Sequence, residues 1–279
     1  TAATGEVTPE RVARLLIELG AEPAAARAAI NGRPDVIPPL ASAARAGHDE
    51  VARLLVELGA DLRPPGTERL LWLSACEGGL LWLVERLLEA GYDAELRRYE
   101  ESGERGLEAA AKAGHRAVVE RLLAAGCALD AASLHAACEG GIVELVFRHL
   151  AAGLAPGAGH FGMTPLATAI RGGHLEVVRL LLDAGADPHK RHHHETLLHL
   201  AAEAGEPAVV ELLLDRGLAS VLEERDALGW TPLFAAGWRG HQAVFDLLIA
   251  RGAALDVVDD AGRQLVAEAA AHGIRVREG

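Results

Sequence analysis

The sequence has few aromatic residues and few lysines, and each shortage argues against a class of protein. Aromatic residues make up 4% of the 279 residues, although half of the chain is apolar. Because β-sandwiches are rich in aromatic and β-branched side chains, an apolar content carried by Ala and Leu favours packed helices. Lys112 and Lys190 are the only lysines, and the formal net charge is −13. Binding to nucleic acid or to an anionic membrane depends largely on Lys and Arg, so we expect neither as a partner.

Cysteine is also scarce, and the chain lacks long apolar runs. An odd set of three cysteines without a Cys-x-x-Cys pair predicts neither a disulfide framework nor a thiolate zinc site. The most apolar stretch, residues 70–84, is interrupted by Glu77 and a glycine pair, so it is too short and too polar to span a bilayer. Residues 1–7 lack the basic and apolar regions of a signal peptide. We therefore expect a cytoplasmic protein without a cofactor.

Glycine, in contrast, is abundant and regularly spaced. Two glycines recur with a constant gap of twelve residues, and the steps between first members are 32, 35, 27, 32, 32 and 35 residues. A near-constant step with a constant internal gap indicates an internal repeat. The seven pairs are Gly47 and Gly59, Gly79 and Gly91, Gly114 and Gly126, Gly141 and Gly153, Gly173 and Gly185, Gly205 and Gly217, and Gly240 and Gly252.

Apolar residues recur between the paired glycines at offsets of 4, 8 and 9 from the first glycine, as at Val177, Leu181 and Leu182. These offsets lie on one face of a helix, and the second glycine supplies its left-handed C-cap. A shorter helix precedes each first glycine, as in TPLATAIRGG (164–173). Each unit is thus a helix, a turn, a helix and an extended connection. No unit can bury its apolar face alone, so the units must stack and bury residues at all three offsets.

The segment GMTPLATAIRGGHLEVVRLLLDAGADP (162–188) closely resembles an ankyrin repeat, and residues 194–217 and 229–253 resemble it well. The resemblance implies an all-α ankyrin-repeat α-solenoid with short β-hairpin fingers. We expect one domain over 1–279, with about seven full repeats (34–258), a divergent N-terminal repeat (8–33) and a C-terminal cap (259–279). Counting the divergent one first, the repeat that contains Gly141 is repeat 5. Its step of 27 residues predicts a missing finger between Cys127 and Ser133, and hence a notch.

Ankyrin proteins use a concave groove, finger tips and inner helices to bind partners, so the resemblance implies that the chain binds another protein or peptide. We expect it to do so as a monomer. Trp and Arg dominate interface hot spots and gather in repeats six to eight. Trp230 follows the finger glycine, so we expect its ring to project from a tip. The candidate partner-binding residues are His160, Phe161, Arg171, His192, His193, Trp230, Trp238 and Arg239.

Two readings remain open for the charged inner-helix positions. Arg45, Glu77, Lys112, Glu139, Arg171 and Glu203 alternate in sign two residues before the first glycine of successive repeats. They predict either a solvated ladder of ion pairs, each worth little, or a charged groove floor that recognises a polar partner.

A different function also remains open, namely an enzyme or small-ligand receptor in the notched groove around repeats five to seven. Glu139, His160, Arg171 and His192 could there supply acid, base and anion-binding groups. The histidines at 189 and 192–194 crowd one finger, but adjacent residues of an extended strand point in opposite directions. We therefore expect a solvated, pH-sensitive loop without a metal site. The alternative is a metal site, which would need His160 or another neighbour as a further ligand.

Overall fold

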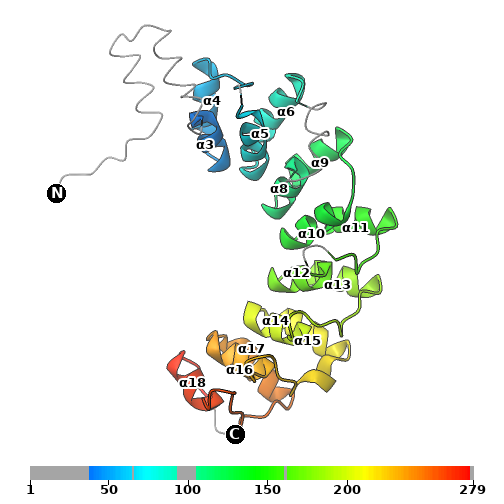
Figure 1. Ribbon diagram of the computed structural model, residues 1–279, viewed down its shortest axis with the longest axis vertical. Helices are drawn as coiled ribbons and strands as arrows, with labels where there is room; N and C mark the ends of the chain where they lie inside the picture. Colours follow the sequence, from blue (N-terminus) through cyan, green and yellow to red (C-terminus); the bar gives the residue numbers. More distant parts are fainter. Residues whose placement is uncertain (1–37, 65, 93–104, 160–161, 277–279) are drawn as a thin grey trace, which may run out of the picture. The chain divides into compact units, whose positions relative to one another are not determined.

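The computed structural model describes residues 38–64, 66–92, 105–159 and 162–276 (Figure 1). The chain divides into two compact units, Thr1–Ala128 and Leu129–Gly279. The divergent repeat 8–33 lies outside the described residues, and the single domain over 1–279 stays a prediction. The helices of the first unit are α3 (Pro39–Arg45), α4 (Asp49–Glu57), α5 (Glu68–Glu77), α6 (Leu81–Glu89), α8 (Gly106–Lys112) and α9 (Arg116–Ala124).

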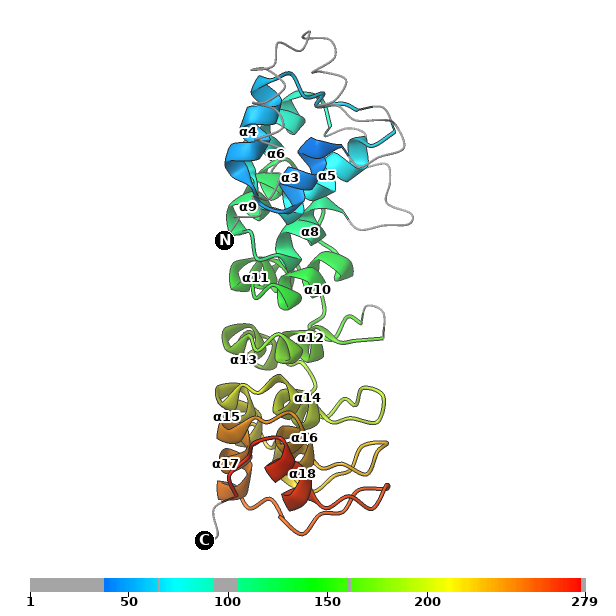
Figure 2. The ribbon, with the colours of Figure 1, turned by 90° about the vertical axis from the view of Figure 1, so that its left-hand side faces the viewer.

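The second unit continues the same alternation of a short inner helix and an outer helix. In Figure 2 its inner helices form one row and its outer helices another, with the fingers on the side of the inner row. The helices are α10 (Ala131–Glu139), α11 (Val143–Ala151), α12 (Pro165–Arg171), α13 (Leu175–Asp183), α14 (Leu197–Ala204), α15 (Pro207–Asp215), the 3₁₀ helix η1 (Leu218–Val221), α16 (Pro232–Trp238), α17 (Gln242–Ala250) and α18 (Leu265–Ala271).

The described residues contain seven complete helix pairs and a final inner helix, so the predicted all-α repeat solenoid is confirmed. Their only β-pairing is isolated, at His192 with Glu195 and at Val258 with Gln264. Both glycines of every predicted pair have positive φ, as at Gly173 (69°) and Gly185 (88°). A side chain is unfavourable in this conformation, which explains the fixed glycine spacing.

Threonine is the N-cap residue of the inner helices α12, α14 and α16. The Oγ1 atoms of Thr164, Thr196 and Thr231 accept hydrogen bonds from the backbone N–H three residues later, at 3.2, 3.4 and 3.3 Å. Such a cap satisfies one of the N–H groups that a helix leaves unpaired at its start. The threonines therefore fix where each inner helix begins and where the preceding finger ends.

The outer helices bury the residues at offset 8 in all seven repeats and those at offset 4 in six, Val51 being half-buried. The expectation for offset 9 is wrong: Leu182 and its equivalents are half-buried in every repeat except at Leu214. Offset 5, as at Val178, is buried in all seven instead. At about 100° per residue, offset 9 lies about 90° from the centre of the face formed by offsets 4, 5 and 8.

The predicted missing finger is confirmed. Residues 125–130 alone separate α9 from α10, whereas residues 184–196 separate α13 from α14. Asp130 caps α10 by accepting a hydrogen bond from the backbone N–H of Ser133 at 2.9 Å. Helix α10 thereby starts two residues earlier in its repeat than α12 does. The finger residues are replaced by an extra half-turn of inner helix.

Candidate functional site

Two positions in each of repeats 6 to 8 bring side chains together on the inner-helix side. One directly precedes the helix-capping threonine, and the other lies two residues before the first glycine. The two positions are eight residues apart, which is about two helical turns, so they lie on the same side of the inner helix. The Arg171 guanidinium donates a weak hydrogen bond to the Met163 sulfur at 3.8 Å, and the rings of Trp230 and Trp238 lie 5.2 Å apart. We call the set the inner face: Met163, Arg171, Glu195, Glu203, Trp230 and Trp238.

The chemistry of the inner face differs in each repeat. Repeat 6 offers a thioether and a guanidinium, repeat 7 two carboxylates and repeat 8 two indole rings. Residues that the fold requires recur in every repeat, so positions that vary in this way are free of that requirement. The repeat pattern therefore does not set the chemistry of the inner face.

Repeat 7 makes the inner face acidic. Burial raises the pKa of half-buried Glu195, and the negative charges of Glu203 and Asp226 raise it further, while Arg171 and His193 act in the opposite direction. Within the described residues, the Glu195 carboxylate has no hydrogen bond or ion pair. Glu203 forms an ion pair with Arg239 of the next repeat at 3.5 Å. A cation placed here would relieve the repulsion between carboxylates.

Repeat 8 overturns the expectation that Trp230 projects from a finger tip. Its side chain is only 7% exposed, and its ring stacks on Phe234 at 5.2 Å. Its indole N–H donates to Asp259 at 3.1 Å. The following finger thus covers the ring. Trp238 is half-buried and keeps part of its surface open, beside Trp230.

Asp259 and Arg263 hold this aromatic cluster together, and the sequence interpretation missed both. Burial raises the pKa of Asp259, but hydrogen bonds from the backbone and guanidinium of Arg263 and from Trp230 outweigh it and lower the pKa to about 2. The same guanidinium lies 4.8 Å from the centre of the Trp238 ring. The sequence did contain a signal for Asp259: Asp226 and Asp259 each stand three residues before a finger glycine, which marks both as recurring finger residues.

The charge alternation of the inner helices gives some of the predicted ion pairs. Arg45 and Glu77 lie 3.0 Å apart, both half-exposed. Glu203 pairs with Arg239, which is one position away from the expected register. In the described part of the chain, Glu139 and Arg171 have no ion-pair partner. Exposed pairs of this kind contribute little to stability.

His192 and His193 lie in the same finger but in different environments. His192 is 4% exposed; its Nε2 bonds the Thr164 hydroxyl at 3.0 Å, while its buried Nδ1 has no partner among the described residues. Burial is the main cause that lowers the pKa of His192. His193 is exposed at the tip, where it and His194 have positive φ. The backbones of His192 and Glu195 exchange two hydrogen bonds and close this two-residue turn.

The residues considered for catalysis are not joined in the described structure. His160, like Phe161, lies outside the described residues. No hydrogen bond or ion pair connects Glu139, Arg171 and His192 there. Arg171 is exposed at the end of α12, whereas His192 is buried beside Thr164.

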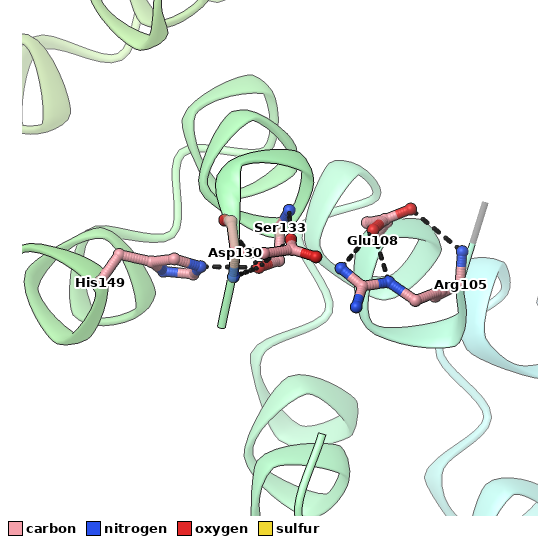
Figure 3. A network of polar contacts seen from close by, with 5 residues as sticks. All are labelled: Arg105, Glu108, Asp130, Ser133 and His149. Carbon is pink, nitrogen blue, oxygen red and sulfur yellow. Dashed lines mark hydrogen bonds and ion pairs between the residues drawn. The ribbon is translucent and has the colours of Figure 1, made fainter. Parts of the chain in front are cut away.

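A buried serine–histidine pair in repeat 5 was also missed. His149 stands where the other repeats have Leu. Its Nε2 bonds the Ser133 hydroxyl at 2.7 Å (Figure 3), and its Nδ1 bonds the Leu145 carbonyl at 2.7 Å. The Ser133 hydroxyl also donates to a carboxylate oxygen of Asp130 at 3.1 Å. Both Ser133 and His149 are 0% exposed, so no substrate reaches them. The pair links α10 to α11. In the first unit, Figure 3 shows a separate pair, Arg105 and Glu108.

Two other kinds of feature are absent from the part of the chain that the structure describes. Within the described ranges, no three His, Cys, Asp or Glu side chains are grouped so that they could hold a metal ion. None of the helices described for this chain is long and apolar enough to cross a membrane.

Comparison with known protein families shows which family the chain belongs to. The family described as ankyrin repeats (3 copies) matches residues 107–192 and 185–259, and the ankyrin repeat matches residues 38–65. No curated protein matched the chain. The matches cover more than half of the sequence and fall on the helix pairs described above. Ankyrin repeats are generally protein-interaction modules, and this chain belongs to the ankyrin-repeat family.

Proposed function

We propose that the chain binds an extended segment of another protein across the inner face of repeats 6 to 8. The observation that carries the proposal is the change of chemistry along that face while the buried offsets remain apolar. Arg171 offers a guanidinium without an ion-pair partner among the described residues, Glu195 and Glu203 offer carboxylates, and Trp238 offers part of an indole ring. A segment with charged and apolar residues in matching order would find a partner for each.

The burial of Trp230 changes its proposed role. In this proposal the buried ring of Trp230 packs against the ring of Trp238 and does not contact the partner. Arg239 and the exposed His193 border the inner face and can extend the contact. We expect the protein to do this as a cytoplasmic monomer.

A pair of charge reversals tests the proposal. Arg171 and Arg179 are both exposed arginines of repeat 6, but Arg171 lies on the inner face and Arg179 on the outer helix. Partners captured by the wild-type chain are quantified by mass spectrometry and compared with those captured by R171E, R179E and W238A. We expect R171E and W238A to reduce capture of the specific partner at least tenfold, since each removes a central contact.

R179E serves as the matched control and should capture the partner normally. Circular dichroism should show the wild-type helix content for all three variants. If R171E and W238A both retain the partner, or if R179E alone loses it, the inner face is not the binding surface.

A further inference from the structure

Helix α11 differs from every other outer helix in its outward face. Phe147 on this helix is 56% exposed, the largest exposure among the large apolar side chains of the described residues. It lies at offset 6 from the first glycine, a position that points away from the core. The other six repeats carry a charged residue at this offset: Arg53, Glu85, Glu120, Arg179, Glu211 and Asp246.

Phe147 is part of a longer apolar stripe. Val143, Leu150 and Ala151 are exposed or half-buried on the same helix. With Phe147 they stand at i, i+4, i+7 and i+8, which places all four within a sector of about 100°. We call these four residues the α11 stripe. At the position of Ala151, four other repeats carry a carboxylate: Glu57, Glu89, Asp183 and Asp215.

Phe147, Val143 and Ala151 point away from the face that packs α11 into the solenoid, and Leu150, at offset 9, lies at the edge of that face. Leu145, Val146 and His149 point inward and are at most 1% exposed. Glu144 and Arg148 form an ion pair at 3.1 Å along one edge of the stripe. The helix therefore has two apolar faces, although a surface helix that packs on one side needs only one.

The spacing and size of the stripe indicate its occupant. Apolar residues at i, i+4, i+7 and i+8 match the ridge of a packed helix, and such anchors are how helices recognise one another. Nine helical residues span about 13 Å, and a strip of that length and about 10 Å wide covers on the order of 130 Å², far below the roughly 800 Å² that each partner buries in a stable dimer. Because Glu144 and Arg148 neutralise each other at the edge of the stripe, they favour an occupant without a large net charge.

We propose that the α11 stripe is a second docking surface, which takes a single amphipathic helix of another protein through its leucine-like side chains. It does not depend on the inner face, because outer and inner helices form separate rows in the second unit (Figure 2). A partner held here would leave the inner face free. Two proteins could then bind the chain at the same time.

A synthetic helix tests this surface. The probe is a fluorescent 15-residue peptide with zero net charge, held helical by a staple on its polar face, with leucines at positions 4, 8, 11 and 15 by design. A peptide of the same composition with its leucines spread around the helix is the control ligand. We expect the patterned peptide to bind the full chain weakly and the control peptide to bind at least tenfold more weakly.

Substitutions locate the site. F147E and A151E introduce charges that other repeats carry at the same positions, so each should fold normally and weaken binding at least tenfold. L228E is the matched control, because Leu228 is 53% exposed but lies on a finger tip, and it should bind like the wild type. Circular dichroism verifies the fold of each variant.

Three outcomes would overturn the proposal. The first is equal binding of the patterned and control peptides, and the second is unchanged binding by F147E and A151E. The third comes from sedimentation velocity: a wild-type dimer that F147E converts to a monomer would show that a second copy of the chain occupies the stripe. R171E should bind the peptide normally, so this test and the test of the inner face fail independently.

Discussion

At the residue scale, Asp259 combines structural and electrostatic roles in a single carboxylate. It accepts hydrogen bonds from the Trp230 indole at 3.1 Å and from the Arg263 backbone N–H at 2.8 Å, and it is 5% exposed. These contacts stabilise the charged form and hold the pKa near 2, below the ordinary value of 3.8. A folded-state pKa below the unfolded one gives stability that is complete above the unfolded pKa and is lost as the pH falls.

We therefore predict that the Trp230 cluster loosens between about pH 4 and pH 2, because protonated Asp259 no longer binds Arg263 as a carboxylate. D259N should be less stable than the wild type at neutral pH and should lack this acid-dependent component. The measurement is the midpoint of urea unfolding followed by tryptophan fluorescence at a series of pH values. D260N, which changes the exposed neighbour, should follow the wild-type profile. An acid profile that is identical in D259N and the wild type would contradict the assignment.

The same residues show why part of the site escaped prediction. The sequence placed Trp230 beside a finger glycine, and that position is correct. The burial of its ring depends on Asp259, which lies 29 residues later in the divergent C-terminal cap. Likewise, His149 was visible as an exception among leucines, but its partner Ser133 belongs to the other helix of the repeat. Pattern within a repeat predicts which face a side chain joins, whereas contacts between helices and repeats require the three-dimensional packing.

At the element scale, the finger formed by residues 184–196 carries local strain. His193 and His194 have φ of 48° and 75°, in the left-handed region that disfavours most side chains. The two residues form the turn between His192 and Glu195, whose backbones pair at 3.0 and 2.9 Å. Asn-Gly is the sequence that suits such a two-residue turn best.

Replacing His193 and His194 together by Asn and Gly should stabilise the chain by about 0.5–1 kcal/mol, since the strained backbone is relieved while the added freedom of glycine offsets part of the gain. Urea unfolding measures the change in free energy. H189N lies in the same finger outside the turn and should leave stability unchanged. A loss of stability in the Asn-Gly variant would mean that the histidine side chains make stabilising contacts at the tip.

The elements themselves were predictable because their signals are local. The glycine spacing and the apolar offsets predicted every helix pair and the missing finger before α10. The error at offset 9 concerned burial alone, because Leu182 has the residue type of a core position but lies at the edge of the packed face. The left-handed turn at His193 gave no such signal, since neither histidine is a usual turn residue.

At the scale of the whole molecule, the helices described within each unit contact chiefly helices of their own repeat or of adjacent repeats. Within the second unit, α12 packs on α10, α13 and α14, and α16 packs on α14, α17 and α18. Stability in such an array is approximately a sum of repeat terms and nearest-neighbour terms. A local defect should therefore weaken its own repeat and the adjacent ones more than distant ones.

Two equivalent core truncations test this locality. Leu87 on α6 and Leu213 on α15 occupy the same offset in repeats 3 and 7, and both are 0% exposed. Each change to Ala should cost about 2–5 kcal/mol, as expected for a buried leucine. Hydrogen exchange followed by mass spectrometry reports the loss of protection along the chain. In L213A we expect the greatest loss in α12–α17 and little change in α3–α6, and in L87A the reverse. Because the variants are matched in residue type, offset and burial, a difference between their patterns reflects position alone. If both variants instead lose protection evenly in all described helices, the chain unfolds as one cooperative body and the nearest-neighbour description is wrong.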